Sequence, residues 1–154
     1  MINYITGFMY STDKKKVALI NKLSPAWQRG LINGIGGKME GDESPSQGMV
    51  REFEEETGVK TLESDWKLFT VISRPGKYNV HFLYCISSKI TKVRTIEREV
   101  VGIFEVDKLP HNVIHNLHWL IPMSLDPSLK FDKPVYLIEE RDAESATEIT
   151  HPIA

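Results

Sequence analysis

Three glutamates with helical spacing are the residues of this sequence best suited to chemistry. Glu52, Glu55 and Glu56 stand at positions i, i+3 and i+4, so a helix would bring their carboxylates together on one side. Carboxylates this close repel one another, and a hard divalent cation such as Mg²⁺ would offset the repulsion through oxygen ligands. A solvated acidic face is the alternative interpretation, but it explains neither the shared stripe nor the glycines upstream. We therefore interpret the glutamates as a cation site that a phosphate-bearing substrate would complete.

The helix that carries these glutamates has its own start and stop signals. Ser44 stands at the N-cap position, Pro45 suits the first helical position, and Gln47 completes a capping box with Ser44. Gly58 stands where a left-handed residue ends a helix. The apolar face expected to pack on a sheet consists of Met49, Val50 and Phe53.

The stretch from Gly37 to Val59 resembles the Nudix box, G-x5-E-x7-R-E-U-x-E-E-x-G-U, in which U is a bulky apolar residue. Every specified position is filled: Gly37, Glu43, Arg51, Glu52, Phe53, Glu55, Glu56, Gly58 and Val59. The resemblance implies an α/β fold, a Nudix-type α/β/α sandwich with a curved mixed sheet. It also implies a hydrolase that cleaves a nucleoside diphosphate linked to another group, with Mg²⁺ or Mn²⁺ as cofactor.

The resemblance assigns a role to each polar residue of the box. The metal ligands that it implies are Glu52, Glu55, Glu56 and the carbonyl of Gly36. Arg51 is expected to orient the glutamates, and Glu43 to support the loop against the helix. A carboxylate would take the proton of a metal-bound water, and the sequence leaves open which one.

Many Nudix enzymes use one more glutamate, from the loop before a late strand. Glu97 and Glu99 both stand in such a loop, in the stretch TIEREVVGIFEV. We choose Glu99, which is nearer the strand, as a further catalytic residue and metal ligand. The alternative is that both side chains merely solvate the loop.

The substrate-binding residues that we select are Trp27, Asn33, Lys38 and Asn116. The run from Asn33 to Lys38, NGIGGK, resembles the NGFGGK of the branch that hydrolyses oxidised purine nucleoside triphosphates, and the later WLIP resembles a helix of that branch. An asparagine amide can both donate to and accept from a base edge, and a tryptophan can stack on a base. The chain departs from that branch at His115 and Asn116, where the branch has two aspartates.

Two residues point to other substrates. Pro75 lies where members that cleave ADP-ribose tend to have a proline, and Tyr78 lies where dinucleoside-polyphosphate members often have a tyrosine. A proline in a hairpin turn and a tyrosine packed on a strand explain the same residues without a substrate.

The function predicted first is therefore hydrolysis of a (deoxy)nucleoside triphosphate to the monophosphate and pyrophosphate. The alternatives are a pyrophosphatase of ADP-ribose or of a dinucleotide, including dinucleoside polyphosphates, and a catalytically silent Nudix domain that senses nucleotides. The intact box argues against the silent domain, since such domains usually lose a metal-binding glutamate.

Composition limits the partners and the compartment. The chain has 154 residues and a formal net charge of −2, which gives no general attraction for nucleic acid or an anionic membrane. Its single cysteine, Cys85, rules out an internal disulfide and fits a reducing compartment. We find no signal peptide and no apolar run of membrane-spanning length, and expect a cytoplasmic protein. The expected partner is a small nucleotide, and the oligomeric state, a homodimer included, stays open.

Strand and helix patterns place the box in one domain. The expected strands are 2–10, 16–21, 31–37, 66–73, 78–88, 101–106 and 134–139. The central strand is expected to be 78–88, which is strongly apolar. A second helix is expected over 113–125, interrupted near Pro122. We expect residues 1–140 to form a single Nudix domain and residues 141–154 to form a mobile C-terminal tail.

Overall fold

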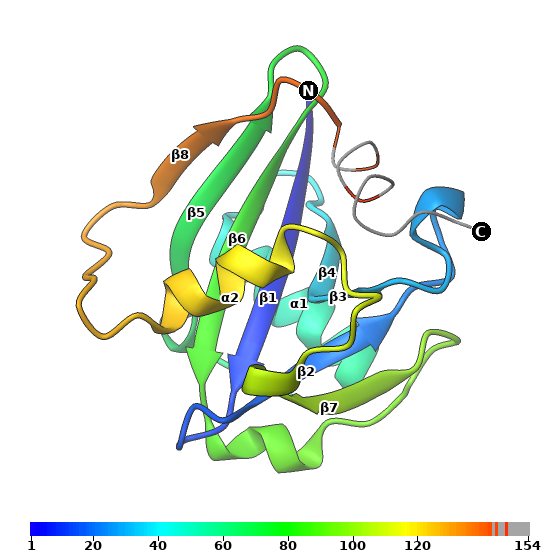
Figure 1. The fold of residues 1–154 in the computed structure, drawn as a ribbon, viewed down its shortest axis with the longest axis vertical. Helices are drawn as coiled ribbons and strands as arrows, with labels where there is room; N and C mark the ends of the chain where they lie inside the picture. The colour runs from blue at the N-terminus through cyan, green and yellow to red at the C-terminus, as the bar shows by residue number, and fades with distance from the viewer. Residues whose placement is uncertain (143, 145–146, 148–154) are drawn as a thin grey trace.

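The strands form one mixed sheet in the computed structural model, which describes residues 1–142, 144 and 147 (Figure 1). The strands are β1 Ile2–Tyr10, β2 Lys16–Asn21, β3 Ile32–Asn33, β4 Ile35–Lys38, β5 Lys67–Arg74, β6 Tyr78–Ile86, β7 Val101–Glu105 and β8 Val135–Ile138. The two α-helices are α1 Pro45–Thr57 and α2 Leu117–Leu125. The mixed α/β class expected from the sequence is confirmed.

The sheet contains both parallel and antiparallel pairs of strands. The main path runs β3-β2-β1-β6-β5-β8, while β4 pairs with β1 and β7 pairs with β2. The central pair β1–β6 and the edge pair β5–β8 are parallel, and the other pairs are antiparallel. The apolar strand β6 therefore lies inside the sheet between β1 and β5, as its composition predicts.

Strand β1 shows how the sheet separates two cores. Phe8 and Tyr10 join the core that contains α2, whereas Ile5 and Met9 join the core that contains α1. Successive side chains of a strand point to opposite faces, so the two helices cover opposite faces of the sheet. Figure 1 shows α2 in front of the sheet and α1 behind it. The expected α/β/α sandwich is confirmed.

Helix α1 is fixed to its face of the sheet by buried apolar side chains. Met49 and Phe53 are fully buried, and the Phe53 ring packs on Trp66 with 5.2 Å between ring centroids. Cys85 lies in the same core, where burial raises the pKa of its thiol to about 11. The thiol is therefore protonated at neutral pH and is not a nucleophile.

The single strand expected over 31–37 is wrong in one respect, because the chain divides at Gly34. β3 before it pairs with β2, while β4 after it pairs with β1. A Cβ at Gly34 would come within 2.6 Å of the Thr6 side chain, so only glycine lets the chain pass that close. After this division Asn33 is the last residue of β3, while Gly36 and Gly37 belong to β4.

The second helix is shorter than the pattern predicts. It begins at Leu117, because Val113 bridges to Ile32 and the Ile114 N–H donates to the Ile32 carbonyl at 2.8 Å. It continues through Pro122 to Leu125, so the expected interruption at the proline is also wrong. The first residues of the predicted helix instead extend the edge of β3.

The expected mobile tail falls largely on residues 143, 145–146 and 148–154, which lie outside the described residues. Asp142 forms an ion pair with Arg74 at 3.1 Å. No helix in the described part of the chain has the length and apolar character needed to cross a bilayer.

Candidate active site

The limits of α1 place its carboxylates, and both limits follow the sequence signals. The Ser44 side chain accepts from the Gln47 N–H, and the Gln47 side chain accepts from the Ser44 N–H, which completes the capping box. Gly58 ends the helix with φ of 76°, a left-handed conformation that favours glycine. Between these ends, Glu52 and Glu56 lie toward the sheet and Glu55 lies nearer solvent.

Arg51 joins the loop before α1 to the glutamates on it. Its guanidinium donates to both carboxylate oxygens of Glu43, at 2.7 and 2.9 Å, and to the carbonyl of Lys38 at 3.1 Å. The same group donates to Glu52 at 3.0 Å and to Glu55 at 3.3 Å. The fork of the guanidinium suits such multiple contacts. The geometry fits the expectation that Arg51 orients the glutamates and Glu43 supports the loop.

Glu56 is the most deeply placed carboxylate of the box. It is 8% exposed, and one of its oxygens accepts from the Gly36 N–H at 3.1 Å. Burial, strengthened by the negative charges of Glu52 and Glu99, raises the pKa of Glu56 to about 8. Burial also raises the pKa of Glu52, although Arg51 acts in the opposite direction. A buried carboxylate and a partly buried one, both with a raised pKa, form a place where a bound cation would be stabilised.

The two glycines of β4 let the backbone approach these carboxylates. A Cβ at Gly37 would stand 2.6 Å from a carboxylate oxygen of Glu52. A Cβ at Gly36 would stand 1.9 Å from the carbonyl oxygen of Ile5, which is a clash with backbone. Glycine is required at both positions for β4 to pass between β1 and the glutamates.

The two candidates for an extra carboxylate take different positions. Glu99 accepts from the Lys22 ammonium at 3.1 Å and from the Leu23 N–H at 2.6 Å. Although burial acts to raise it, these donors hold the pKa of Glu99 below its usual range. Glu97 is exposed, and its charge raises the pKa of Glu52. Both side chains therefore act on the box electrostatically, and Glu99 is the one held in place by neighbours.

The donor set fits a hard divalent cation. The box offers three carboxylates and the carbonyl of Gly36, and Mg²⁺ and Mn²⁺ prefer oxygen ligands of these kinds. Glu52 and Glu55 share Arg51, while Glu56 is turned to the Gly36 N–H. With these contacts in place, no three histidine, cysteine, aspartate or glutamate side chains within residues 1–142, 144 and 147 are arranged to hold a metal ion.

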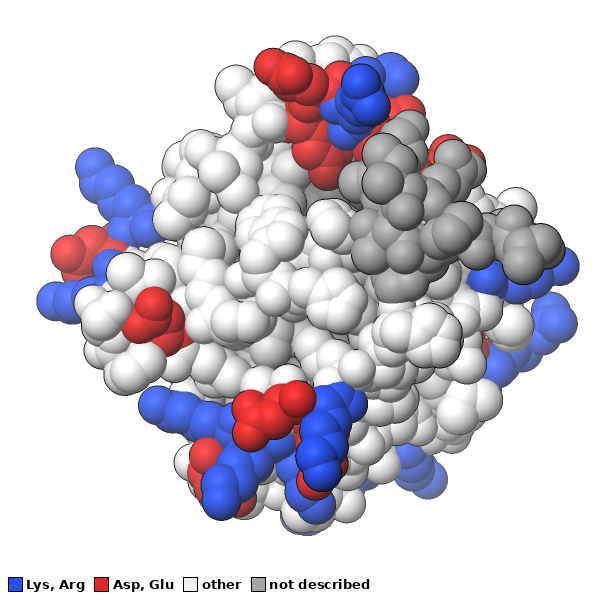
Figure 2. Space-filling model, viewed as in Figure 1, with Lys and Arg blue, Asp and Glu red and all other residues white. Residues whose placement is uncertain are grey.

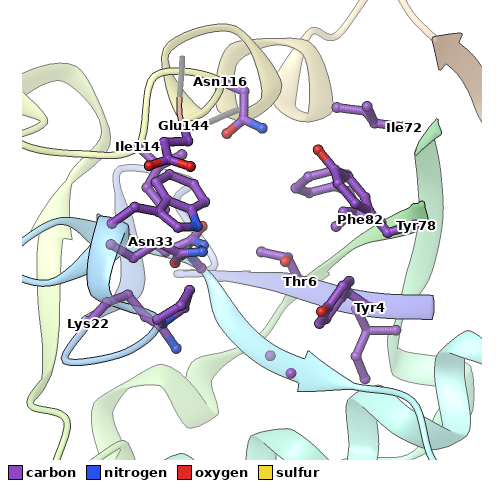
Figure 3. Close-up of a pocket in the computed structure, with 18 of the residues that line it drawn as sticks. Tyr4, Thr6, Lys22, Asn33, Ile72, Tyr78, Phe82, Ile114, Asn116 and Glu144 are labelled. Carbon is purple, nitrogen blue, oxygen red and sulfur yellow. Dashed lines mark hydrogen bonds between the residues drawn. The ribbon is translucent and has the colours of Figure 1, made fainter. Parts of the chain in front are cut away.

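A cavity of about 620 Å³ lies beside Gly36 and Gly37, which form part of its wall (Figure 3). None of the box glutamates lines this cavity. Its size is typical of small-molecule sites. Aromatic and aliphatic side chains form much of its lining, with a few amides and charged groups among them. Its walls include Tyr4, Thr6, Lys22, Trp27, Gln28, Asn33, Ile72, Tyr78, Phe82, Ile114, Asn116, Glu139 and Glu144.

Two asparagines give this cavity its hydrogen-bonding character. Asn116 reaches into it from the turn before α2, with Asn33 on one wall and Phe82 across from it (Figure 3). The side-chain oxygen of Asn33 accepts from the Gly34 N–H at 2.8 Å, which leaves its amide nitrogen with a long contact of 3.4 Å to Gln28. The side-chain oxygen of Asn116 is buried and has no hydrogen-bond donor among the described residues. A buried acceptor without a partner is costly, and a bound ligand could supply the donor.

Comparison with known proteins agrees with this geometry. The family model described as the NUDIX domain matches residues 5–135. The chain belongs to the NUDIX family. The enzyme class expected from the box, a Nudix-type pyrophosphohydrolase, is confirmed with it. No curated protein sequence matches the chain.

Solved structures share the NUDIX fold at low sequence identity. The mutator MutT protein from Bacillus halodurans is 19% identical, with a TM-score of 0.65 over 88% of this chain and 87% of that one. The NUDIX domain of Shewanella oneidensis NrtR, solved with ADP ribose, is 17% identical, with a TM-score of 0.64 over 80% and 86%. A MutT NUDIX hydrolase from Burkholderia pseudomallei is 20% identical, with a TM-score of 0.61 over 77% and 95%.

The NUDIX cavity brings together three of the four substrate-binding residues selected from the sequence. Trp27, Asn33 and Asn116 line it, whereas the Lys38 side chain is exposed and lies outside it. Of the two residues that pointed to other substrates, Tyr78 lines the cavity and Pro75 is an exposed turn residue outside it.

Sequence reasoning missed several cavity residues, some of which lie beyond the NUDIX match. Glu139 follows β8, and its carboxylate accepts from the Tyr78 hydroxyl, while Arg74 donates to the carbonyls of Glu139 and Glu140. These contacts hold the chain after β8 against the β5–β6 hairpin. The alternation of β1, which puts Tyr4 and Thr6 on the face of Phe8, was the signal available for part of this wall.

Proposed function

We propose that this NUDIX protein is a Mg²⁺- or Mn²⁺-dependent pyrophosphohydrolase that converts a (deoxy)nucleoside triphosphate to the monophosphate and pyrophosphate. One observation carries the proposal: the cavity and the box glutamates meet at Gly36 and Gly37. Both glycines line the cavity, and each also approaches a box carboxylate, Glu56 or Glu52. A nucleoside bound in the cavity would therefore present its phosphates to the carboxylates.

The nucleoside end would be recognised by the amides and rings of the cavity. Asn33 and Asn116 can donate to and accept from the edge of a base. Trp27 lines the same cavity and can stack on a base or close its mouth. Lys22, also in the wall, carries positive charge near the phosphate end, where it already pairs with Glu99.

The phosphate end would be handled by the box. A divalent cation held by Glu52, Glu55, Glu56 and the Gly36 carbonyl would offset the charge of the phosphates and make a bound water more acidic. In the hydrolysis, the water oxygen forms a bond to phosphorus, the anhydride bond to the leaving pyrophosphate breaks, and a carboxylate accepts the water proton. Arg51 would keep Glu52 and Glu55 in position.

A second candidate is a nucleoside diphosphate derivative such as ADP-ribose or a dinucleotide. Tyr78 supports it, because this ring lines the cavity and packs edge-on against Tyr4 with 6.3 Å between ring centroids. Such an aromatic wall can bind a second ring system beyond the diphosphate. The NrtR structure solved with ADP ribose shares the fold.

The remaining features of the proposal concern the whole chain. We infer that residues 1–140 act as one domain and that the partner is a small nucleotide rather than nucleic acid or membrane. The buried thiol of Cys85 suits a reducing cytoplasm, which we propose as its compartment.

A hydrolysis panel tests the substrate class. Common and oxidised (d)NTPs, ADP-ribose, FAD, NADH and diadenosine polyphosphates are incubated with Mg²⁺ or Mn²⁺, and the products are separated by chromatography. The proposal expects preference for a triphosphate, with a KM that rises in Asn33→Ala and Asn116→Ala while kcat changes little. Preference for ADP-ribose or a dinucleotide, with AMP released, would establish the second candidate. Tight binding without turnover would establish a nucleotide sensor.

A further inference from the structure

One wall of the cavity is formed by the loop of residues 23–30, which we call the wall loop. Two backbone hydrogen bonds close its base, from the Lys22 N–H to the Leu31 carbonyl at 2.8 Å and from the Gly30 N–H to the Lys22 carbonyl at 2.9 Å. The cavity residues that it contributes are Ser24, Pro25, Trp27 and Gln28. The shape of the cavity therefore depends on where this loop is held.

Burial holds the two halves of the wall loop unequally. Trp27, in the second half, is partly buried and packs against the core that contains α2. Residues 23–26, in the first half, are all exposed. An exposed segment gains little from the hydrophobic effect, while fixing its backbone costs conformational entropy. The first half therefore needs polar contacts to keep one position.

Sheet pairing places Glu99 beside this first half. Strands β2 and β7 are antiparallel, and the Asn21 N–H continues their pairing by donating to the Val100 carbonyl at 2.8 Å. One step further along the same register, Lys22 stands opposite Glu99. Side chains directly opposite each other in an antiparallel pair are close enough to interact. The Lys22 ammonium donates to one carboxylate oxygen of Glu99 at 3.1 Å.

The other carboxylate oxygen of Glu99 accepts from the wall loop itself. It accepts from the Leu23 N–H at 2.6 Å and, more weakly, from the Ser24 N–H at 3.4 Å. On the face shown in Figure 2, charged side chains stand at the margin of the molecule. The side chains of Lys22 and Glu99 are instead only 16% and 17% exposed. Solvent screens such a sheltered pair less than it screens a surface pair, so these contacts are strong enough to hold the loop.

We propose that Glu99 is a positioning residue that fastens the wall loop and thereby fixes the nucleoside end of the cavity. One oxygen holds Lys22, at the base of the loop, and the other holds its exposed first half through the Leu23 N–H. The inference rests on the proposed function, because it concerns the affinity of the same cavity for a nucleotide. It differs from metal ligation, because fastening uses the oxygens of Glu99 as hydrogen-bond acceptors.

Glutamine and alanine at position 99 separate the two roles. Glutamine keeps an oxygen that can accept from the Leu23 N–H, although it loses the charge that attracts Lys22. Alanine loses both contacts. Fastening therefore expects a graded series, in which Glu99→Gln lies between the wild type and Glu99→Ala. The two variants carry the same charge, so a difference between them reports on the loop and not on electrostatic repulsion of phosphate.

Amide hydrogen exchange of the full chain, resolved by NMR with EDTA present and no nucleotide, is the first test. The Leu23 amide is expected to exchange about tenfold faster in Glu99→Ala than in the wild type, with Glu99→Gln between them. Glu97→Ala is the matched control, because Glu97 lies in the same connection and is exposed, so the exchange rate should not change. An unchanged rate in Glu99→Ala, or an equal increase in Glu97→Ala, would overturn the proposal.

Nucleotide binding measures the consequence for the cavity. AMP, GMP, CMP and UMP are titrated with EDTA present, so that neither turnover nor metal contributes. For the monophosphate that the wild type binds most tightly, the dissociation constant is expected to be about fivefold higher in Glu99→Ala than in Glu99→Gln. Equal constants in the two variants would overturn the proposal. If the wild type binds none of the four, the proposed function fails, and the exchange result alone decides whether Glu99 fastens the loop.

Discussion

The electrostatics of the box can be tested at Glu56 by measuring how the free energy of unfolding depends on pH in the absence of metal. A carboxyl group whose pKa is raised by folding, here from 4.5 to about 8, binds its proton more tightly in the folded state. Its effect on stability is absent below about pH 4.5 and becomes a growing cost as pH rises toward 8. At roughly 1.4 kcal/mol per pKa unit, the cost is about 1 kcal/mol at pH 5 and about 3 kcal/mol at pH 7.

Glu56→Gln removes this cost while keeping an oxygen that can accept from the Gly36 N–H. In urea unfolding with EDTA present, we expect the variant to gain stability over the wild type, and the gap to widen by about 2 kcal/mol from pH 5 to pH 7. Glu54→Gln is the control on the same helix, since Glu54 is exposed and its substitution removes no buried carboxyl group. A gap for Glu56→Gln that stays constant with pH would refute the assignment of a buried, cation-seeking carboxylate.

Three further substitutions test neighbouring parts of the site. Gly37→Ala should displace the Glu52 carboxylate, which a Cβ would meet at 2.6 Å, and so weaken Mg²⁺ binding measured by calorimetry far more than it changes the Tm. Arg51→Lys should lower the unfolding free energy by about 1–3 kcal/mol, measured in urea, because an ammonium cannot make the two-point contact with Glu43. Glu55→Gln should fold with an unchanged circular dichroism spectrum yet lose nearly all turnover; retained activity would place the metal elsewhere.

Local signals explain why the box helix could be predicted from sequence. Ser44, Gln47 and Gly58 determine the ends of α1 through contacts with residues at most four positions away. The glutamates then follow from helical spacing alone. Apolar runs on either side of turn residues likewise located β1, β2 and the β5–β6 hairpin, because both signals are local in the sequence.

Features that depend on distant contacts could not be predicted in this way. The chain divides at Gly34 because the residues before it pair with β2 and the residues after it pair with β1. No local sequence pattern indicates these long-range pairings. Val113 leaves the predicted helix to bridge Ile32, which is far away in sequence. The wall of the cavity around Glu139 depends on donors from the β5–β6 hairpin, so neither the box nor the periodicity pointed to it.

The most direct test of the account is a phosphorus NMR time course of nucleoside triphosphate hydrolysis by the purified protein, with Mg²⁺ and then with excess EDTA. The account predicts that pyrophosphate and nucleoside monophosphate appear together in equal amounts, and that EDTA stops the reaction. Release of inorganic phosphate with nucleoside diphosphate, or hydrolysis that continues in EDTA, would contradict a metal-dependent pyrophosphohydrolase built on Glu52, Glu55 and Glu56.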